Sequence, residues 1–102
     1  MVARVASFEG VNVQEAERTM DEALALIRPL TENLAGYQAQ IELVSSDGKV
    51  LSLAFFDSED NAQAAESTFE EEMPRRLGDI YKSWEGRRVS VGRYSVLDDS
   101  RG

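Results

Sequence analysis

The chain has no cysteine and no histidine among its 102 residues. Without cysteine it can form no disulfide, no thiolate nucleophile and no cysteine-ligated metal site, which agrees with a reducing compartment. Without histidine it lacks the commonest general base, the commonest metal ligand and the usual proximal ligand of haem. The sequence therefore predicts a protein that holds no metal ion and no other cofactor.

Long apolar runs and an excess of basic residues are missing as well. No apolar run approaches the roughly 20 residues of a membrane-spanning helix. The start, MVARVASFEG, lacks the long apolar core and the small-residue cleavage site of a secretory signal. Eleven basic against 19 acidic residues give a net charge of −8, which would repel phosphate backbones and anionic lipids. We expect a soluble, cytoplasmic protein that binds neither nucleic acid nor membranes.

The length and composition fit one globular domain that covers residues 1–102. The chain is 42% hydrophobic and 29% charged, which is ordinary for a globular protein. A chain of this length buries roughly two thirds of its unfolded surface around one core. We therefore expect a single core and no second domain.

Residues 37–57 form the clearest pattern, two stretches of alternating apolar and polar residues joined by a turn signal. This alternation is typical of half-buried β-strands. A three-residue loop, Ser46 to Gly48, places Leu43 opposite Leu51 and brings the apolar residues of both strands to one face. The sequence therefore predicts a hairpin closed by a type I turn with Gly48 in the left-handed conformation.

Residues 12–30 carry apolar side chains every three or four positions, which predicts the first helix. Asn12 is suited to be its N-cap, because its side chain can accept a hydrogen bond from the first turn. Pro29 cannot continue an unbroken helix, so we expect a kink or an end near Ile27 or Arg28.

A second helix is predicted after the hairpin, with Asp57 or Ser58 as its cap. Pro74 is expected to break it, and a further helical piece would end at Gly86. The glutamates of residues 70–72 are interpreted as a solvated helix surface, because they lack the second ligand type of a metal site.

Short apolar strands are predicted at residues 2–8 and 87–97, the second with a bulge at Gly92. The resulting order, β-α-β-β-α-β with a central hairpin, is the ferredoxin-like pattern of the α+β class. Both helices would then cover one face of a four-stranded antiparallel sheet. The more apolar side of the hairpin is expected to face the helices as their core: Ile41, Leu43, Leu51, Leu53 and Phe55.

The other side of the hairpin would then form an open sheet face of mixed polarity. Val44, Val50, Ala54 and Phe56 interrupt its polar residues, whereas water would favour an evenly polar face. A second copy of the chain is the simplest cover, because a twofold axis lets identical patches bury each other. We expect a homodimer through the open sheet face that Phe56→Asp would dissociate or unfold.

Three segments resemble a known family: ARVASFEG at the start, IRPLTENLAGYQAQ after the first helix, and FFDSEDNAQAAE before the second. They are similar to the dimeric α/β-barrel superfamily, in particular its antibiotic-biosynthesis-monooxygenase-like (ABM) branch, over nearly the whole chain. The resemblance implies two subunits packed sheet against sheet, each with a small cavity between its sheet and its helices. Some members are cofactor-independent oxygenases of polycyclic aromatic substrates, others degrade haem, and many have no known reaction.

The chain departs from the active members of this family. The haem degraders resemble one another in an asparagine on the first strand and a histidine on the second helix, and both are missing here. Haem degradation is therefore disfavoured. The quinone-forming oxygenases hold their substrate with asparagine, tryptophan, tyrosine and arginine, of which only loose counterparts exist: Asn61, Trp84, Tyr37, Tyr81, Tyr94 and Arg93.

Large aromatic side chains on faces that are expected to converge predict a ligand pocket between helices and sheet, lined by Tyr37, Phe55, Phe69, Tyr81 and Trp84. The alternative is that these side chains only close the core. Two functions remain. The chain is either an uncharacterised dimeric barrel that binds a small apolar or aromatic molecule, or a cofactor-independent monooxygenase of an aromatic, polyketide-like substrate. The missing motif residues favour the first, and whether the protein is an enzyme stays open.

Overall fold

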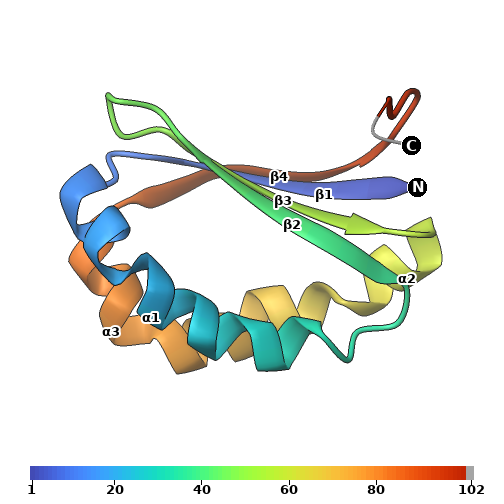
Figure 1. Ribbon diagram of the computed structural model, residues 1–102, viewed down its shortest axis with the longest axis horizontal. Helices are drawn as coiled ribbons and strands as arrows, with labels where there is room; N and C mark the ends of the chain where they lie inside the picture. The colour runs from blue at the N-terminus through green and yellow to red at the C-terminus, as the bar shows by residue number, and fades with distance from the viewer. Residues whose placement is uncertain (101–102) are drawn as a thin grey trace.

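The computed structural model describes residues 1–100, and the last two residues of the predicted domain lie outside it. Four antiparallel strands form one sheet, β1 (Val2–Glu9), β2 (Tyr37–Val44), β3 (Val50–Phe56) and β4 (Arg87–Ser95). Their order in the sheet is β2-β3-β1-β4 (Figure 1). This is the order of the ferredoxin-like fold, and it confirms the predicted topology.

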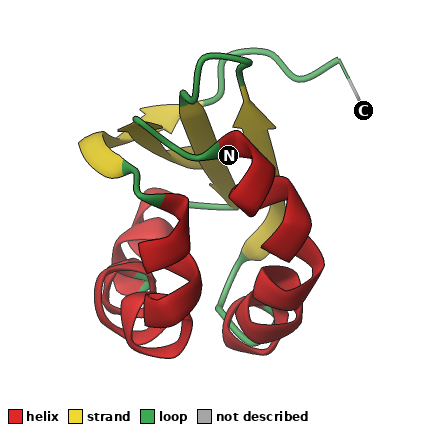
Figure 2. Ribbon diagram, turned by 90° about the vertical axis from the view of Figure 1, so that its left-hand side faces the viewer, coloured by secondary structure: helices red, strands yellow, loops and turns green. Residues whose placement is uncertain are grey.

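A helical layer covers one face of the sheet (Figure 2). It contains α1 (Val13–Thr31) and an irregular stretch of α2 (Glu59–Ala64), the π-helical turn η1 (Thr68–Glu72) and α3 (Met73–Trp84). None of the described helices is both long enough and apolar enough to cross a membrane.

The predicted N-caps are present, since the side chains of Asn12 and Ser58 each accept a hydrogen bond from the first turn of their helix. Pro29, however, does not end the first helix near Arg28. The helix continues to Thr31 with Pro29 inside it, although proline cannot donate to the carbonyl of Ala25. The predicted end was therefore too early.

Pro74 also does not break the second helical stretch. It lies in the first turn of α3, directly after η1, where the carbonyl of Thr68 accepts a hydrogen bond from the N–H of Met73. This i→i+5 spacing is that of a π-helix. Pro74 is tolerated because it lies in the first turn of α3, where proline is compatible with a helix. The π-helical turn η1 carries Phe69 and Glu70, which line the cavity described below.

The hairpin has the predicted register and turn. Leu43 pairs with Leu51, and the N–H of Gly48 donates to the carbonyl of Ser45 at 3.1 Å. Gly48 has a φ of +85°, which favours glycine. A Cβ at this position would lie 2.7 Å from the carbonyl oxygen of Val11, so the neighbouring loop requires glycine as well.

The side of the sheet that faces the helices is not the side that the sequence predicted. Phe56 is fully buried, and its ring meets the ring of Phe69 edge-to-face with the centroids 6.3 Å apart. Leu43 and Leu51 instead lie on the open face and are 50% and 42% exposed. The prediction was wrong because alternation shows which residues share a face but not which face the helices cover. The open face carries Ile41, Leu43, Leu51, Leu53 and Phe55, and the helix-facing side carries Gln40, Glu42, Val50, Ser52, Ala54 and Phe56.

β1 lies in the centre of the sheet, between β3 and β4. Its pairing with β4 shifts between Ser7 and Phe8, opposite Val89, so the predicted bulge at Gly92 was misplaced. Beyond the strands, the N–H of Val96 donates to the carbonyl of Met1 at 3.0 Å, which brings the first residue beside the end of β4.

The core divides into two clusters. One lies between the sheet and α2 and includes Phe56 and Ala62. The other joins α1 to α3 and includes Ile27, Met73 and Leu77. The second cluster contains only helix residues, so α1 and α3 pack on each other there and not on the sheet. A space remains between these two helices and the sheet beneath them.

Candidate functional site

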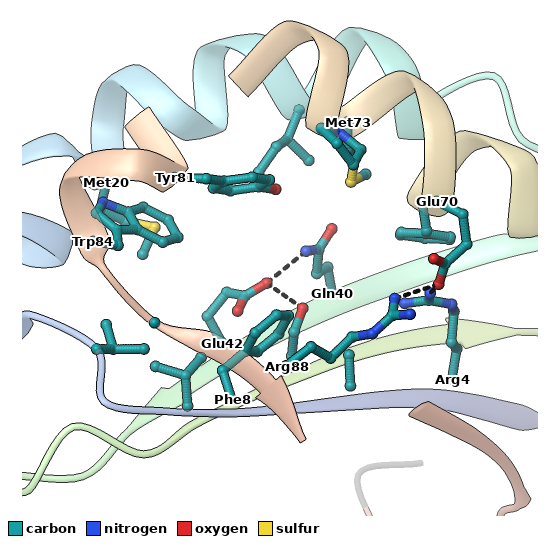
Figure 3. A pocket seen from close by; sticks show the side chains of 18 residues that line it. Arg4, Phe8, Met20, Gln40, Glu42, Glu70, Met73, Tyr81, Trp84 and Arg88 are labelled. Carbon is teal, nitrogen blue, oxygen red and sulfur yellow. Dashed lines mark hydrogen bonds and ion pairs between the residues drawn. The ribbon is translucent and has the colours of Figure 1, made fainter. Parts of the chain in front are cut away.

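A cavity of about 380 Å³ lies between the sheet and the helical layer (Figure 3). Its size is within the range of small-molecule sites. All four strands supply its floor, while α1, η1 and α3 supply its roof. Most of the lining is aromatic, aliphatic or thioether in character, and the polar groups are few: Arg4, Gln40, Glu42, Ser52, Glu70, Tyr81 and Arg88.

Three of the five aromatic residues predicted for a pocket line this cavity, namely Phe69, Tyr81 and Trp84. The other two lie elsewhere. The ring of Tyr37 packs on that of Phe56 at 5.9 Å, in the cluster beneath α2. The side chain of Phe55 is on the other side of β3, on the open face of the sheet. The cavity and the predicted pocket thus share the roof residues but not the floor.

Trp84 is held in place by its indole nitrogen, which donates to the hydroxyl of Thr19 at 2.7 Å. That hydroxyl donates in turn to the carbonyl of Glu15 at 2.7 Å. The ring of Tyr81 packs against the indole with the centroids 5.3 Å apart. Since the indole nitrogen already has a partner, Trp84 offers the cavity only apolar ring surface.

Glu42 is an acidic group on the floor of the cavity. Its Oε1 accepts hydrogen bonds from Nε2 of Gln40 at 2.6 Å and from Oγ of Ser52 at 2.7 Å. Glu42 is exposed to solvent through the cavity, but the protein around its carboxylate removes part of the hydration, and this desolvation raises the pKa of Glu42. The two hydrogen bonds oppose the shift, because both stabilise the charged form.

Tyr81 lies on α3 and lines the roof of the cavity, above the floor that carries Glu42. Its burial, and then the negative charge of Glu42, raise the pKa of Tyr81 to about 12. The phenol is therefore neutral at physiological pH and able both to donate and to accept a hydrogen bond.

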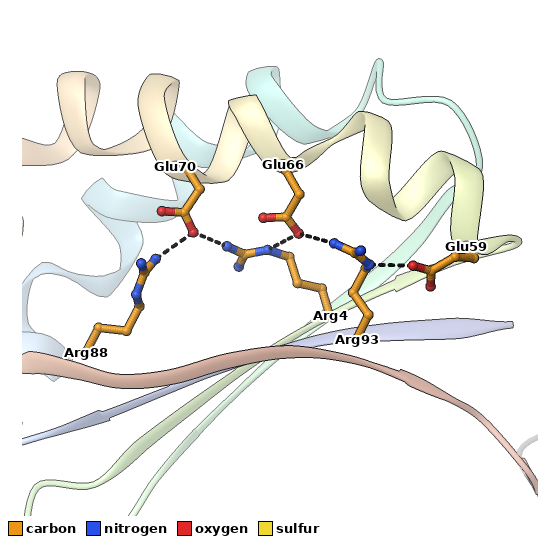
Figure 4. Close-up of polar contacts among 6 residues, drawn as sticks. All are labelled: Arg4, Glu59, Glu66, Glu70, Arg88 and Arg93. Carbon is orange, nitrogen blue, oxygen red and sulfur yellow. Dashed lines mark hydrogen bonds and ion pairs between the residues drawn. The ribbon is translucent and has the colours of Figure 1, made fainter.

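A chain of alternating charges closes one end of the cavity and continues along the sheet (Figure 4). Glu70 binds Arg88 at 2.6 Å and Arg4 at 2.8 Å through the same oxygen. Arg4 then binds Glu66 at 3.1 Å, and its guanidinium lies 4.5 Å from the centroid of the Phe69 ring. Arg93 extends the chain from Glu66 to another acidic residue, Glu59.

Several of these residues were missed or misjudged at the level of sequence. The glutamates of residues 70–72 are not simply a solvated surface, because Glu70 bridges two strands of the sheet to η1. Glu71, which is exposed, and Glu72, which pairs with Arg75 one turn further on, do fit that interpretation. The available signal was spacing, since Glu59, Glu66 and Glu70 are seven and four residues apart and so share one helix face.

Glu42 is one of the polar residues on the side of the hairpin that was expected to form the open face. Because the sheet turns that side to the helices, Glu42 lies in the cavity. Among residues 1–100, no cluster of three acidic side chains has a geometry that could hold a metal ion. The site is thus an apolar cavity that contains the carboxylate of Glu42 and the neutral phenol of Tyr81, with a chain of ion pairs at one end.

No protein-family model matches the sequence, and no curated protein is detectably similar to it. Solved structures, in contrast, are similar over nearly the whole chain. A dimeric ferredoxin-like protein from an uncultured marine organism has a TM-score of 0.69 and 13% identity, with 97% of both chains covered. A provisional antibiotic biosynthesis monooxygenase from Bordetella bronchiseptica has a TM-score of 0.66 and 16% identity, covering 94% of this chain and 96% of that one.

A third similar structure is SnoaB, a cofactor-independent oxygenase from Streptomyces nogalater. Its TM-score is 0.65 at 12% identity, and the match covers 99% of this chain and 97% of SnoaB. At such identities the similarity shows a shared fold. It confirms the fold that the sequence resemblance implies, that of the ABM-like ferredoxin-like proteins.

Proposed function

We propose that the protein binds a small apolar or aromatic molecule in the cavity between its sheet and its helices. The cavity itself carries this proposal. Its walls are aromatic rings and thioethers, its volume is about 380 Å³, and a few polar groups converge on it. Ligand sites in proteins have this composition, in which apolar walls supply affinity and the polar groups fix the orientation.

Trp84 makes the proposal testable, because it is the only tryptophan of the chain and lines the cavity. Titration with naphthalene- and anthracene-based compounds is expected to change the fluorescence of Trp84 saturably. Val50→Phe places a larger side chain in the cavity and is expected to abolish the change. Leu26→Phe, at an exposed position on α1, is the matched control. Binding that Val50→Phe leaves unchanged would place the ligand elsewhere and contradict the proposal.

We infer also that the protein is a homodimer that pairs through the open sheet face. Val89, Tyr94 and Leu43 lie exposed there, at 50%, 61% and 50% of their surface. An apolar face of this kind, without a helix over it in the described chain, is typical of a protein interface. The dimeric ferredoxin-like protein of similar fold supports the same assembly. Phe56, proposed from sequence as a contact, lies in the core and takes no part in this face.

A second candidate is a cofactor-independent monooxygenase of an aromatic substrate. It is supported by the fold shared with SnoaB and by Glu42, a carboxylate of raised pKa that faces an apolar cavity and is suited to remove a proton. In such a reaction a substrate CH₂ group and one O₂ give a carbonyl group and one water, so no external reductant is needed.

Oxygen uptake by the purified protein with a panel of phenols and polycyclic aromatics decides between the two. Uptake that depends on substrate and falls at least about tenfold in Glu42→Gln would favour the oxygenase. Binding without uptake would leave the protein as a binding protein. We infer a cytoplasmic location for either function, which the absence of cysteine supports.

A further inference from the structure

Glu42 stands apart from the other charged groups of the cavity. Arg4, Arg88 and Glu70 line the cavity and belong to a chain of ion pairs that continues through Glu66, Arg93 and Glu59. The three arginines and three glutamates of this chain bind one another, so their charges cancel. Glu42, in contrast, takes part in no ion pair among the residues that the structure describes, and both of its hydrogen-bond donors are neutral. The cavity therefore keeps one negative charge without a counter-charge.

The position of this charge is fixed. Gln40 and Ser52 both donate to Oε1 of Glu42, and this pair of bonds holds the carboxylate in one orientation on the floor (Figure 3). Oε2 accepts no hydrogen bond from residues 1–100. It is left for whatever enters the cavity.

The groups around this carboxylate also suit a cation. Phe8, Tyr81 and Trp84 line the same cavity, and the faces of aromatic rings attract positive charge. Tyr81 lies close enough to Glu42 to respond to its charge, and its neutral hydroxyl can accept a hydrogen bond from an N–H group. The net charge of −8 would draw a cation towards the protein from solution.

We propose that the cavity recognises a protonated amine carried on an aromatic body, with the ammonium group on Oε2 of Glu42 and the rings against Tyr81 and Trp84. This inference rests on the proposed ligand-binding function and narrows its ligand class. An ammonium supplies the missing counter-charge, donates to Oε2 and gains from the aromatic walls. A carboxylate ligand would meet the like charge of Glu42 instead, and at Arg4 or Arg88 it would have to compete with Glu70.

Three probes of nearly equal shape test the proposal by isothermal titration calorimetry at neutral pH: naphthylmethylamine, naphthylmethanol and naphthoate. The amine is expected to bind the wild type about tenfold more tightly than the alcohol, and naphthoate most weakly. In Glu42→Gln, which keeps the size of the side chain, amine and alcohol should differ by about twofold or less. Glu17→Gln, at an exposed position of α1, should keep the wild-type preference.

The outcomes separate this inference from the proposed function. Equal binding of all three probes, or a preference for the amine that survives in Glu42→Gln, would overturn the inference and leave the binding function intact. Tightest binding by naphthoate would overturn it as well and point to Arg88. Absence of binding by all three, with the variants folded by circular dichroism, would count against both.

Discussion

Nη2 of Arg4 lies 2.8 Å from Oε1 of Glu70, which ties the central strand of the sheet to η1 at the end of the cavity. Arg4 is only 5% exposed, although it carries a full charge. Burial of an arginine is tolerated when its donors are occupied, and here Glu66 and Glu70 occupy them from the helical layer. The helices above the cavity are thus fixed to the sheet by charge as well as by apolar packing.

Replacement of Arg4 by Met is expected to destabilise the protein by about 2 kcal/mol. The substitution keeps most of the apolar stem, but it removes the contact with Phe69 and leaves two partly exposed glutamates without their buried partner. Urea denaturation measures the loss. Arg18→Met, which removes an exposed pair with Glu15, serves as the control and should cost at most about 0.5 kcal/mol. Equal losses for the two variants would show that the buried pair has no special role.

Glu42→Gln is expected to change how stability depends on pH. The pKa of Glu42 is raised in the folded state, so the folded protein binds this proton more tightly than the unfolded chain. The wild type should therefore lose stability relative to the variant as pH rises from the ordinary carboxyl range towards neutrality. Urea denaturation of both proteins across that range tests this sign. A wild type that gains on the variant with rising pH would refute it.

Tyr81 should ionise near pH 12, whereas an ordinary tyrosine ionises near 10. Ultraviolet titration of tyrosinate, compared between the wild type and Tyr81→Phe, isolates its transition. Glu42→Gln should lower this pKa only in part, because burial is the larger cause. Circular dichroism on the same samples separates ionisation from unfolding, since a raised tyrosine pKa weakens the fold as pH passes from 10 to 12. Loss of a transition near pH 10 in Tyr81→Phe would contradict the assignment.

Two glycine substitutions should have opposite signs. Gly48→Ala is expected to destabilise the protein by more than about 1 kcal/mol, because the turn requires positive φ and a Cβ would meet Val11. Gly78→Ala is expected to stabilise it by up to about 1 kcal/mol, because alanine favours the helix. A Cβ at Gly78 meets nothing within 4 Å. Thermal or urea denaturation measures both, and a stabilising Gly48→Ala would mean that the turn is not held as described.

Leu43→Asp and Leu51→Asp are each expected to convert a homodimer to monomer, because they place a charge on the open sheet face. Size-exclusion chromatography with light scattering measures the mass. Leu26→Asp changes an exposed apolar residue on α1 and should leave the mass unchanged. A wild type that is monomeric at tens of micromolar, or a dimer that tolerates both substitutions, would rule out this interface.

The topology and the hairpin register could be predicted from the sequence, because alternation and loop length together determine which residues pair. Leu43 opposite Leu51 follows from Gly48 alone once the strands are recognised. The facing of the sheet could not be predicted in the same way. The side with Leu43 and Leu51 is the more apolar one, and a rule that gives the helices the most apolar side fails when a cavity with Glu42 lies beneath them.

The predicted pocket failed at Tyr37 for a local reason. The pairing of β2 with β3 shifts between Tyr37 and Ala39, so Tyr37 lies opposite Phe56 although Ala39 lies opposite Phe55. The extra residue places Tyr37 on the helix-facing side of the sheet, but at the end covered by α2. There its ring packs on Phe56 and does not line the cavity. The roof residues Tyr81 and Trp84 were easier to find, because helical spacing alone places them on one face of α3.

The central position of β1 has a consequence for how the chain is built. The hairpin of β2 and β3 is local and can form as soon as its residues have been synthesised, but β1 pairs on its other side with β4, the last strand to be made. Until Arg87 and the residues after it emerge from the ribosome, β1 is an unprotected edge. The first strand made must therefore wait for the last before the middle of the sheet is complete, and this long-range pairing should set the pace of folding.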